Sequence, residues 1–293
     1  PHNFIELIKA SIDYLKGKKF ELLPDFPTGG YIDASNYNHG MRGGKIRVRA
    51  KIEELDKKTL AIKEIPYSTT TSSLIDSILK ANDQGKIKIK KVIDNTAKDV
   101  EVQIQLAPGV SSDITIDALY AFTDCEVSIS PNTCVIVNEK PLFLPVEEVL
   151  KISTDQTVEL LKKELEIRLN ELNEAWHLSS LEKIFIENKI YRNIEDAETW
   201  EEVLSTIDKG LAKFKSKLRR EVTEDDLVRL TEIKIKRISK FDSFKADEYI
   251  KGLEEEIEKV NFNLENLVDY AIKYFDDLLK KFGKGRERKA ELK

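Results

Sequence analysis

The chain has 293 residues, 34% charged and 41% hydrophobic, which favours two domains with long exposed helices over one large core. Two cysteines are too few for a disulfide framework, and no apolar run approaches the roughly 18 residues that cross a bilayer. The net charge of −5 argues against a polyanion as partner of the chain as a whole. We expect a cytoplasmic protein with reduced thiols and no membrane contact. Because Pro1 stands first and Met41 is the only methionine, we also expect a piece of a longer protein.

The first half of the chain has the pattern of an α+β domain. A helix is predicted to begin after Asn3, a favourable N-cap residue, and to end at Gly17. Apolar and polar residues then alternate in four predicted strands, at 46–52, 59–65, 87–92 and 100–106. Helices are predicted at 71–80 and 111–122, so a mixed sheet with helices is expected.

After Pro145 the pattern becomes helical. Apolar residues step by three or four from Val158 to Trp176, and again from Leu253 to Leu278 without a slip. The second stripe would extend about 39 Å as one helix. A long antiparallel helical hairpin, a coiled coil with a small all-α head at about 178–240, accommodates both stripes. Thr223 and Asp226 resemble a capping box within that head.

A row of cations is the strongest functional pattern. Residues 1–91 carry 17 Lys and Arg against 11 Asp and Glu, whereas the remaining 202 carry 31 against 42. In a strand, Lys45, Arg47, Arg49 and Lys51 would line one face about 6.6–6.8 Å apart, with Ile46, Val48, Ala50 and Ile52 facing the core. Arg42 and two glycines precede the row. Such a row suits a phosphate backbone better than a small ligand, and it indicates no base-specific contact.

A second row, Lys86, Lys88 and Lys90, alternates with two isoleucines. It has two interpretations that stay open, namely DNA binding and lysine protection of an edge strand against aggregation. The three histidines are far apart and no Cys/His spacing indicates a metal site. No nucleophile and base are recognisable as a pair.

Four motifs occur in order and carry a resemblance. They are Pro1-His2-Asn3, the run from Pro24 to Thr28, Arg42-Gly43 leading into Ile46-Arg47-Val48-Arg49-Ala50, and Glu64-Ile65-Pro66-Tyr67. Together they resemble the A subunit of bacterial type IIA DNA topoisomerases, which are gyrase and topoisomerase IV. The resemblance covers essentially the whole chain but does not separate gyrase from topoisomerase IV.

The resemblance implies an organisation and a function. Residues 1–23 would end the winged-helix region, 24–145 would form the tower domain that supports gate DNA, and 146–293 the hairpin with the exit-gate head. Double-stranded DNA would contact Arg42, Lys45, Arg47, Arg49 and Lys51, with Lys86, Lys88 and Lys90 as further candidates. A homodimer contact would come from the head, with Leu181, Ile184, Phe185, Tyr191 and Trp200 as candidate residues. The full enzyme, an isomerase that controls chromosome topology, would pass one duplex through another with ATP and Mg²⁺ bound by an ATPase B subunit.

Two departures limit what the resemblance implies. The family's catalytic tyrosine follows an arginine, and no Arg-Tyr pair occurs in this chain. The chain alone is therefore expected to have no catalytic residue, no cofactor and no DNA cleavage. In addition, residues 69–73 replace an Asn-Lys pair that the family often carries, which removes one expected DNA contact.

Two other hypotheses remain. The chain could be a structural coiled-coil dimerisation protein without DNA binding, its basic strands serving solubility. It could also be an enzyme with its own site in the α+β domain, which a deep pocket with perturbed carboxylates near Asp25 or Asp33 would indicate.

Overall fold

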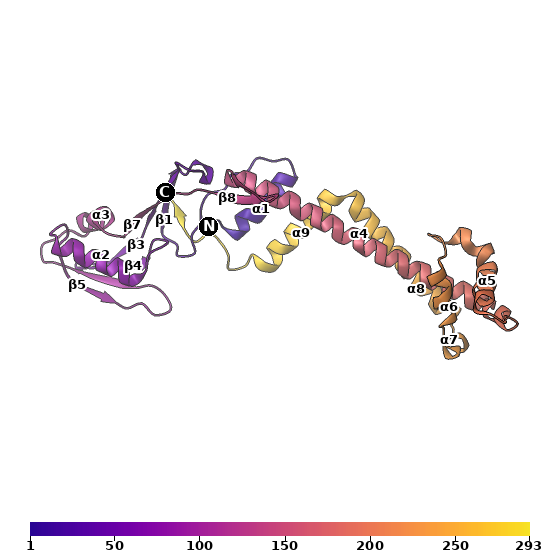
Figure 1. The fold of residues 1–293 in the computed structure, drawn as a ribbon. Helices are drawn as coiled ribbons and strands as arrows, with labels where there is room; N and C mark the ends of the chain where they lie inside the picture. Colours follow the sequence, from indigo (N-terminus) through magenta and orange to yellow (C-terminus); the bar gives the residue numbers. More distant parts are fainter. The chain divides into compact units, whose positions relative to one another are not determined.

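A computed structural model describes residues 1–293 and divides them into two compact units. Unit 1 consists of Pro1–Gln156 and Ile272–Lys293, and unit 2 of Thr157–Ala271. Strands lie in unit 1, and unit 2 is helical (Figure 1). The predicted fold class, an α+β region followed by long helices, is confirmed.

The first sheet of unit 1 has the strand order β10-β1-β2-β7. Its strands are β1 (Tyr31–Asn36), β2 (Lys45–Arg49), β7 (Glu126–Ile129) and β10 (Glu291–Leu292). Strand β2 pairs antiparallel with β1 and β7, and β10 runs parallel to β1. Ile32, Ile46 and Val48 are buried on one face of this sheet, in a core that includes Phe26 and Val146.

The second sheet has the order β3-β4-β6-β5. Its strands are β3 (Lys51–Asp56), β4 (Thr59–Glu64), β5 (Ile89–Asp94) and β6 (Val102–Leu106). Helices α2 (Thr71–Asp83) and α3 (Ser112–Phe122) pack against it through Leu74, Ile78 and Leu119. A separate hairpin of β8 (Cys134–Val137) and β9 (Lys140–Phe143) follows.

The stretch 46–52, predicted as one strand, is two strands in two sheets. The chain changes sheet at Ala50, whose N–H donates to the Cys125 carbonyl at 2.8 Å. The Ala50 carbonyl accepts a bond from the Tyr120 hydroxyl at 2.8 Å. This correction matters because Lys51 leaves the sheet that holds the other cations of its row. The strand predicted at 87–92 also starts later, at Ile89.

Both ends of the chain pack into unit 1. Helix α1 (Phe4–Leu15) begins as predicted at Asn3, whose side chain accepts a bond from the Glu6 N–H at 3.2 Å. The last residues of the chain also dock onto unit 1. Asp25 accepts bonds from the backbone N–H groups of Lys289 and Ala290, at 3.2 and 2.9 Å. These bonds place β10 beside β1.

Unit 2 contains an antiparallel pair of helices, α4 (Val146–Glu187), which begins in unit 1, and α8 (Ser243–Glu265). Leu172 and Trp176 of α4 pack with Leu253 and Ile257 of α8. The Trp176 indole N–H also donates to Glu254 at 2.9 Å. The apolar stripe predicted on α4 is present: Leu161, Leu165, Leu172 and Trp176 are buried, and Val158 and Leu169 are partly buried.

The head consists of the helices between α4 and α8 and the end of α4 on which they pack. Its elements are η2 (Ile190–Ile194), α5 (Trp200–Leu211), η3 (Ala212–Lys217), α6 (Glu224–Thr231) and α7 (Ile235–Ser239). Ile207, Leu211 and Leu230 are buried in its core. The predicted capping box is present, with Asp226 N–H donating to Thr223 at 3.3 Å and Thr223 N–H donating to Asp226 at 3.0 Å.

The second predicted stripe is not one continuous helix. Helix α8 ends at Asn266, whose side-chain amide donates to the Phe262 carbonyl at 2.9 Å, and α9 (Leu267–Phe282) begins after it. On α9 Phe275 is buried against Ile8 and Ile12, whereas Tyr274, which continues the three-and-four spacing, is exposed. None of the helices combines the length and apolar composition needed to cross a bilayer.

Candidate nucleic-acid interface

Lys45, Arg47 and Arg49 form an exposed row on β2. The intervening Ile46 and Val48 are 3% and 0% exposed, so the strand turns its apolar side chains into the core and its cations to solvent. Alternate side chains on a strand lie about 6.6–6.8 Å apart. The alternation predicted from the sequence is present for these three residues.

Carboxylates from the neighbouring strands stand opposite both arginines. Arg47 donates to Asp33 of β1 through Nη2 at 2.7 Å and Nε at 3.2 Å. Arg49 donates to Glu126 of β7 through Nε at 2.5 Å. Exposed ion pairs of this kind contribute only about 0.2–1 kcal/mol each. A phosphate oxygen can therefore replace either carboxylate at low cost.

Neighbouring groups stabilise the ionised form of Asp33. Hydrogen bonds from Ser35 and from Arg47 hold the pKa of this carboxyl well below its usual range. Asp33 consequently stays ionised at neutral pH. Its negative charge balances the positive charge of Arg47 until another anion displaces it. Lys45 has no ion pair and is exposed, so it is the freest cation of the row.

An aromatic ring extends the row. Tyr31 stands opposite Arg49 in the register of β1 and β2. The ammonium groups of Lys293 and Lys51 lie 3.5 and 5.6 Å from the centre of its ring. Lys51, although it starts the second sheet, thus returns to the edge of the row, where it is also 3.3 Å from Glu64. Lys293 is a neighbouring cation that the sequence pattern did not indicate.

Arg42 lies in the turn before β2. Its carbonyl accepts a bond from the Asn38 amide at 3.3 Å, and its side chain lines a pocket of about 370 Å³. Gly43 has φ +92° and open space around it, whereas a Cβ on Gly44 would lie against the Tyr37 carbonyl. The Gly44 N–H already donates to the Met41 carbonyl at 3.1 Å. It is therefore not free for a phosphate.

The lysines at 86, 88 and 90 are exposed at one edge of the second sheet. Only Lys90 lies within β5, and Lys86 has its ammonium 5.4 Å from the ring of Phe122. Strand β5 is an edge strand, as lysine protection would require. These lysines belong to a different sheet from the β2 row, and both interpretations stay open.

The family model for the A subunit of DNA gyrase and topoisomerase IV matches residues 1–276. The chain belongs to this family. The DNA topoisomerase 4 A subunit of Borreliella burgdorferi is 37% identical over 292 residues, which are 100% of this chain and 46% of that protein. The DNA gyrase A subunit of Brachyspira hyodysenteriae is 26% identical over 277 residues, 87% of this chain and 32% of that protein. The chain thus spans less than half the length of these relatives.

Two of the family's motifs join the two ends of the chain. The imidazole Nε2 of His2 lies 2.8 Å from the Tyr37 hydroxyl, and burial lowers the pKa of His2 to about 4. Asn3 donates from its side-chain amide to Asp25 at 3.0 Å and to the Arg286 carbonyl at 2.9 Å. The Pro-His-Asn and Pro-Asp-Phe-Pro motifs are therefore parts of one hydrogen-bond network that holds β10 at the edge of the first sheet.

One further family motif, Glu64-Ile65-Pro66-Tyr67, fixes the other side of the β2 row together with Phe26 and Gly30. The Gly30 N–H donates to the Glu64 carboxylate at 2.5 Å, and the ring of Phe26 stacks on Tyr67 with centroids 4.8 Å apart. Gly30 has φ +86°, and a Cβ there would lie 2.5 Å from the Arg49 carbonyl oxygen. Only glycine fits this approach to the basic strand. The motifs that carried the resemblance thus hold the strand from both directions.

The candidate dimer residues of the head differ in exposure. Leu181 and Phe185 are 1% and 2% exposed and lie in the core of the head. Ile184 and Tyr191 are partly buried against that core. Trp200, the first residue of α5, is 54% exposed. Among these candidates, Trp200 offers the largest apolar side chain to a partner, and substitutions at Leu181 or Phe185 would test folding of the head instead.

A buried polar cluster in the head was only partly foreseen. Asp226, 3% exposed, accepts bonds from Arg220 at 2.7 and 2.9 Å and lies 3.1 Å from Nε2 of the buried His177. Although burial opposes it, these bonds and that from the Thr223 N–H hold the pKa of Asp226 below its usual range. The cluster lies inside the fold and connects α4 to α6. No group of three or more His, Cys, Asp or Glu has a geometry that suits a metal ion.

Proposed function

We propose that this chain is the DNA-supporting and dimerising part of a type IIA topoisomerase A subunit. In full length that enzyme would relax or decatenate DNA by ATP-dependent passage of one duplex through another. The exposed row Lys45, Arg47 and Arg49, in a chain that belongs to this family, is the observation that carries the DNA-binding part.

The chemistry of the row favours backbone contact. Three cations on one strand, with Lys51 and Lys293 at its edge, present charge along a line and no donor–acceptor pattern for bases. Arginine forms bidentate bonds with phosphate as it does with carboxylate. Arg47 already donates from Nε and Nη2 to a single oxygen of Asp33, Oδ2. A phosphate would take the place of Asp33 without a change in the shape of the row.

The chain's own contribution would be support and not cleavage. No Arg-Tyr pair occurs in the sequence, so the tyrosine that attacks DNA would be supplied by another part of the subunit. ATP and Mg²⁺ would act on the B subunit. The exposed Trp200 on the head would take part in a homodimer contact at the exit gate.

A salt titration of duplex binding tests the DNA-binding part. Each phosphate contact contributes about −0.9 to the slope of log K against log salt. Arg47→Gln with Arg49→Gln should therefore flatten the slope by at most about 1.8, since salt also weakens the carboxylate pairs that phosphate would displace. The matched control is Lys162→Gln with Lys163→Gln on α4, which removes the same charge from two exposed lysines. An unchanged slope in the arginine variant would reject the row as the DNA contact.

The alternative function is a dimerisation protein without DNA binding. The observation in its favour is that Arg47 and Arg49 already have carboxylate partners. Under this alternative the chain would form dimers and would not bind duplex DNA even at low salt.

A further inference from the structure

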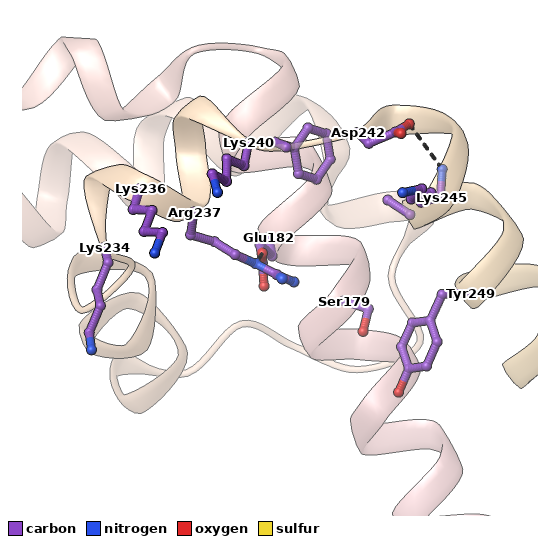
Figure 2. A pocket seen from close by; sticks show the side chains of 11 residues that line it. Ser179, Glu182, Lys234, Lys236, Arg237, Lys240, Asp242, Lys245 and Tyr249 are labelled. Carbon is purple, nitrogen blue, oxygen red and sulfur yellow. Dashed lines mark hydrogen bonds and ion pairs between the residues drawn. The ribbon is translucent and has the colours of Figure 1, made fainter.

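Unit 2 contains a basic pocket that the DNA-binding proposal does not use. The pocket, of about 500 Å³, lies between α4, the segment around α7 and the start of α8 (Figure 2). Its charged lining consists of five cations and two carboxylates: Lys234, Lys236, Arg237, Lys240 and Lys245 against Glu182 and Asp242. Unit 2 as a whole has the opposite balance, since residues 157–271 carry 20 Lys and Arg against 27 Asp and Glu.

Both carboxylates in the pocket are already engaged. Glu182 accepts a bond from Arg237 Nε at 2.6 Å. Asp242 caps α8 by accepting bonds from the N–H groups of Phe244 and Lys245, at 3.0 and 3.2 Å. The four lysines of the lining form no ion pair. These four exposed lysines are therefore free to pair with a bound anion.

The cations are held by a segment that is anchored in the head. Ile233, Ile238 and Phe241 alternate with the basic residues and pack against the core of the head. Figure 2 shows Lys234, Lys236, Arg237 and Lys240 on this segment, with Ser179 and Glu182 on α4 and Tyr249 on α8. The segment that carries the lysines is therefore held in place by the packing of the head.

We propose that this pocket binds a ligand carrying two or more phosphate groups. The unpaired lysines supply point charges for the phosphates, as lysine does in other phosphate sites. Its volume lies within the range of about 300–1,000 Å³ typical of small-ligand sites. Tyr249 is 57% exposed and offers its ring to an aromatic base. This chemistry is shared by a free nucleoside triphosphate and by a nucleic-acid strand.

Calorimetric titration of the whole chain distinguishes these sources. The probes are inorganic tripolyphosphate, ATP and a single-stranded oligonucleotide of about 12 nucleotides. All titrations use the Arg47→Gln and Arg49→Gln background, so that binding at the β2 row does not affect the comparison. Binding of tripolyphosphate identifies a free polyphosphate as ligand, and binding of the oligonucleotide alone identifies a nucleic-acid strand.

Two variants assign the binding to the pocket. Lys236→Gln with Lys240→Gln should weaken binding of the probe about tenfold for each lysine–phosphate bond that is removed. Lys209→Gln with Lys213→Gln, which removes the same charge from exposed lysines elsewhere in the head, should leave it unchanged. Tyr249→Leu should weaken ATP or the oligonucleotide and not tripolyphosphate. The proposal is overturned if no probe binds, or if the pocket variant binds as tightly as the control.

Discussion

Replacing Asp33 by asparagine and Glu126 by glutamine should make this chain bind duplex DNA more tightly. In the free protein Arg47 is held by Asp33 and Arg49 by Glu126. Any phosphate that takes an arginine must first displace its carboxylate. Both substitutions keep the shape and an oxygen acceptor, so the strands should pair as before while the competing charge is lost.

The size of the effect follows from the exposure of the two pairs. The arginine side chains are 49% and 47% exposed, so solvent screening applies to both pairs. With about 0.2–1 kcal/mol for each exposed pair, their combined loss corresponds to about a 2- to 30-fold gain in affinity. Removing two negative charges also strengthens DNA binding wherever the charges lie on the chain, because the net charge becomes less negative. Glu159→Gln with Glu166→Gln on α4 changes the net charge equally and measures that general part.

Fluorescence anisotropy of a labelled duplex, titrated at several salt concentrations, measures the difference. We expect the β-sheet variant to exceed the α4 control in affinity, with the gap narrowing as salt rises. Equal affinity in the two variants would mean that neither arginine is limited by its carboxylate. Weaker binding in the β-sheet variant would mean that the carboxylates orient the arginines for phosphate, and the exchange reasoning would be refuted.

Four other predictions concern single sites. Gly30→Ala should destabilise unit 1 by about 1–3 kcal/mol more than Gly43→Ala in denaturant unfolding, because a Cβ at Gly30 would lie 2.5 Å from a carbonyl oxygen and one at Gly43 would meet nothing; equal costs would contradict this. Burial lowers the pKa of His2 to about 4, so between pH 7 and pH 4 the unfolded chain binds a proton that the folded chain does not. The free energy of unfolding should therefore fall by about 1–2 kcal/mol over this range, a value already reduced for solvent screening of the partly exposed ring. A His2→Gln variant should lack this loss. Asp226→Asn should cost about 2–3 kcal/mol in stability, because a buried carboxylate that holds Arg220 is lost; an unchanged midpoint of unfolding would show that the cluster does not stabilise the head. Trp200→Glu should weaken self-association in sedimentation across a concentration series, whereas Ile114→Glu on α3 should not.

Local patterns predicted much of the fold. The cap at Asn3, the alternation in β2 and the Thr223–Asp226 box depend on residues within a few positions of each other, and all three are present. The apolar stripe of α4 was equally predictable, because residues three or four positions apart lie on one face of a helix. The division of β2 from β3 was not predictable, since the alternation continues through Ala50 and the groups that turn the chain there come from Tyr120 and Cys125.

The end of α8 was missed for a similar reason. The three-and-four spacing runs without a slip across Asn266, so the periodicity contains no signal of an interruption. Asn266 leaves the helical conformation, with φ −117° and ψ 48°, and bonds back to Phe262. Asparagine has low helix propensity and competes for the backbone in this manner. The local bonding of Asn266 therefore ends the helix, although the apolar spacing continues.

The two basic surfaces differ in one respect that the sequence did not reveal. On β2 the arginines are matched by carboxylates 14 and 77 residues away, whereas the lysines beside α7 have no such partners. Added salt weakens the arginine pairs and the contacts that would replace them, so part of the effect cancels on β2. In the pocket only Arg237 has an ion pair, with Glu182, so at the four unpaired lysines added salt acts only against the ligand. For the same number of phosphates contacted, binding at the pocket should therefore lose affinity more steeply with salt than binding at β2.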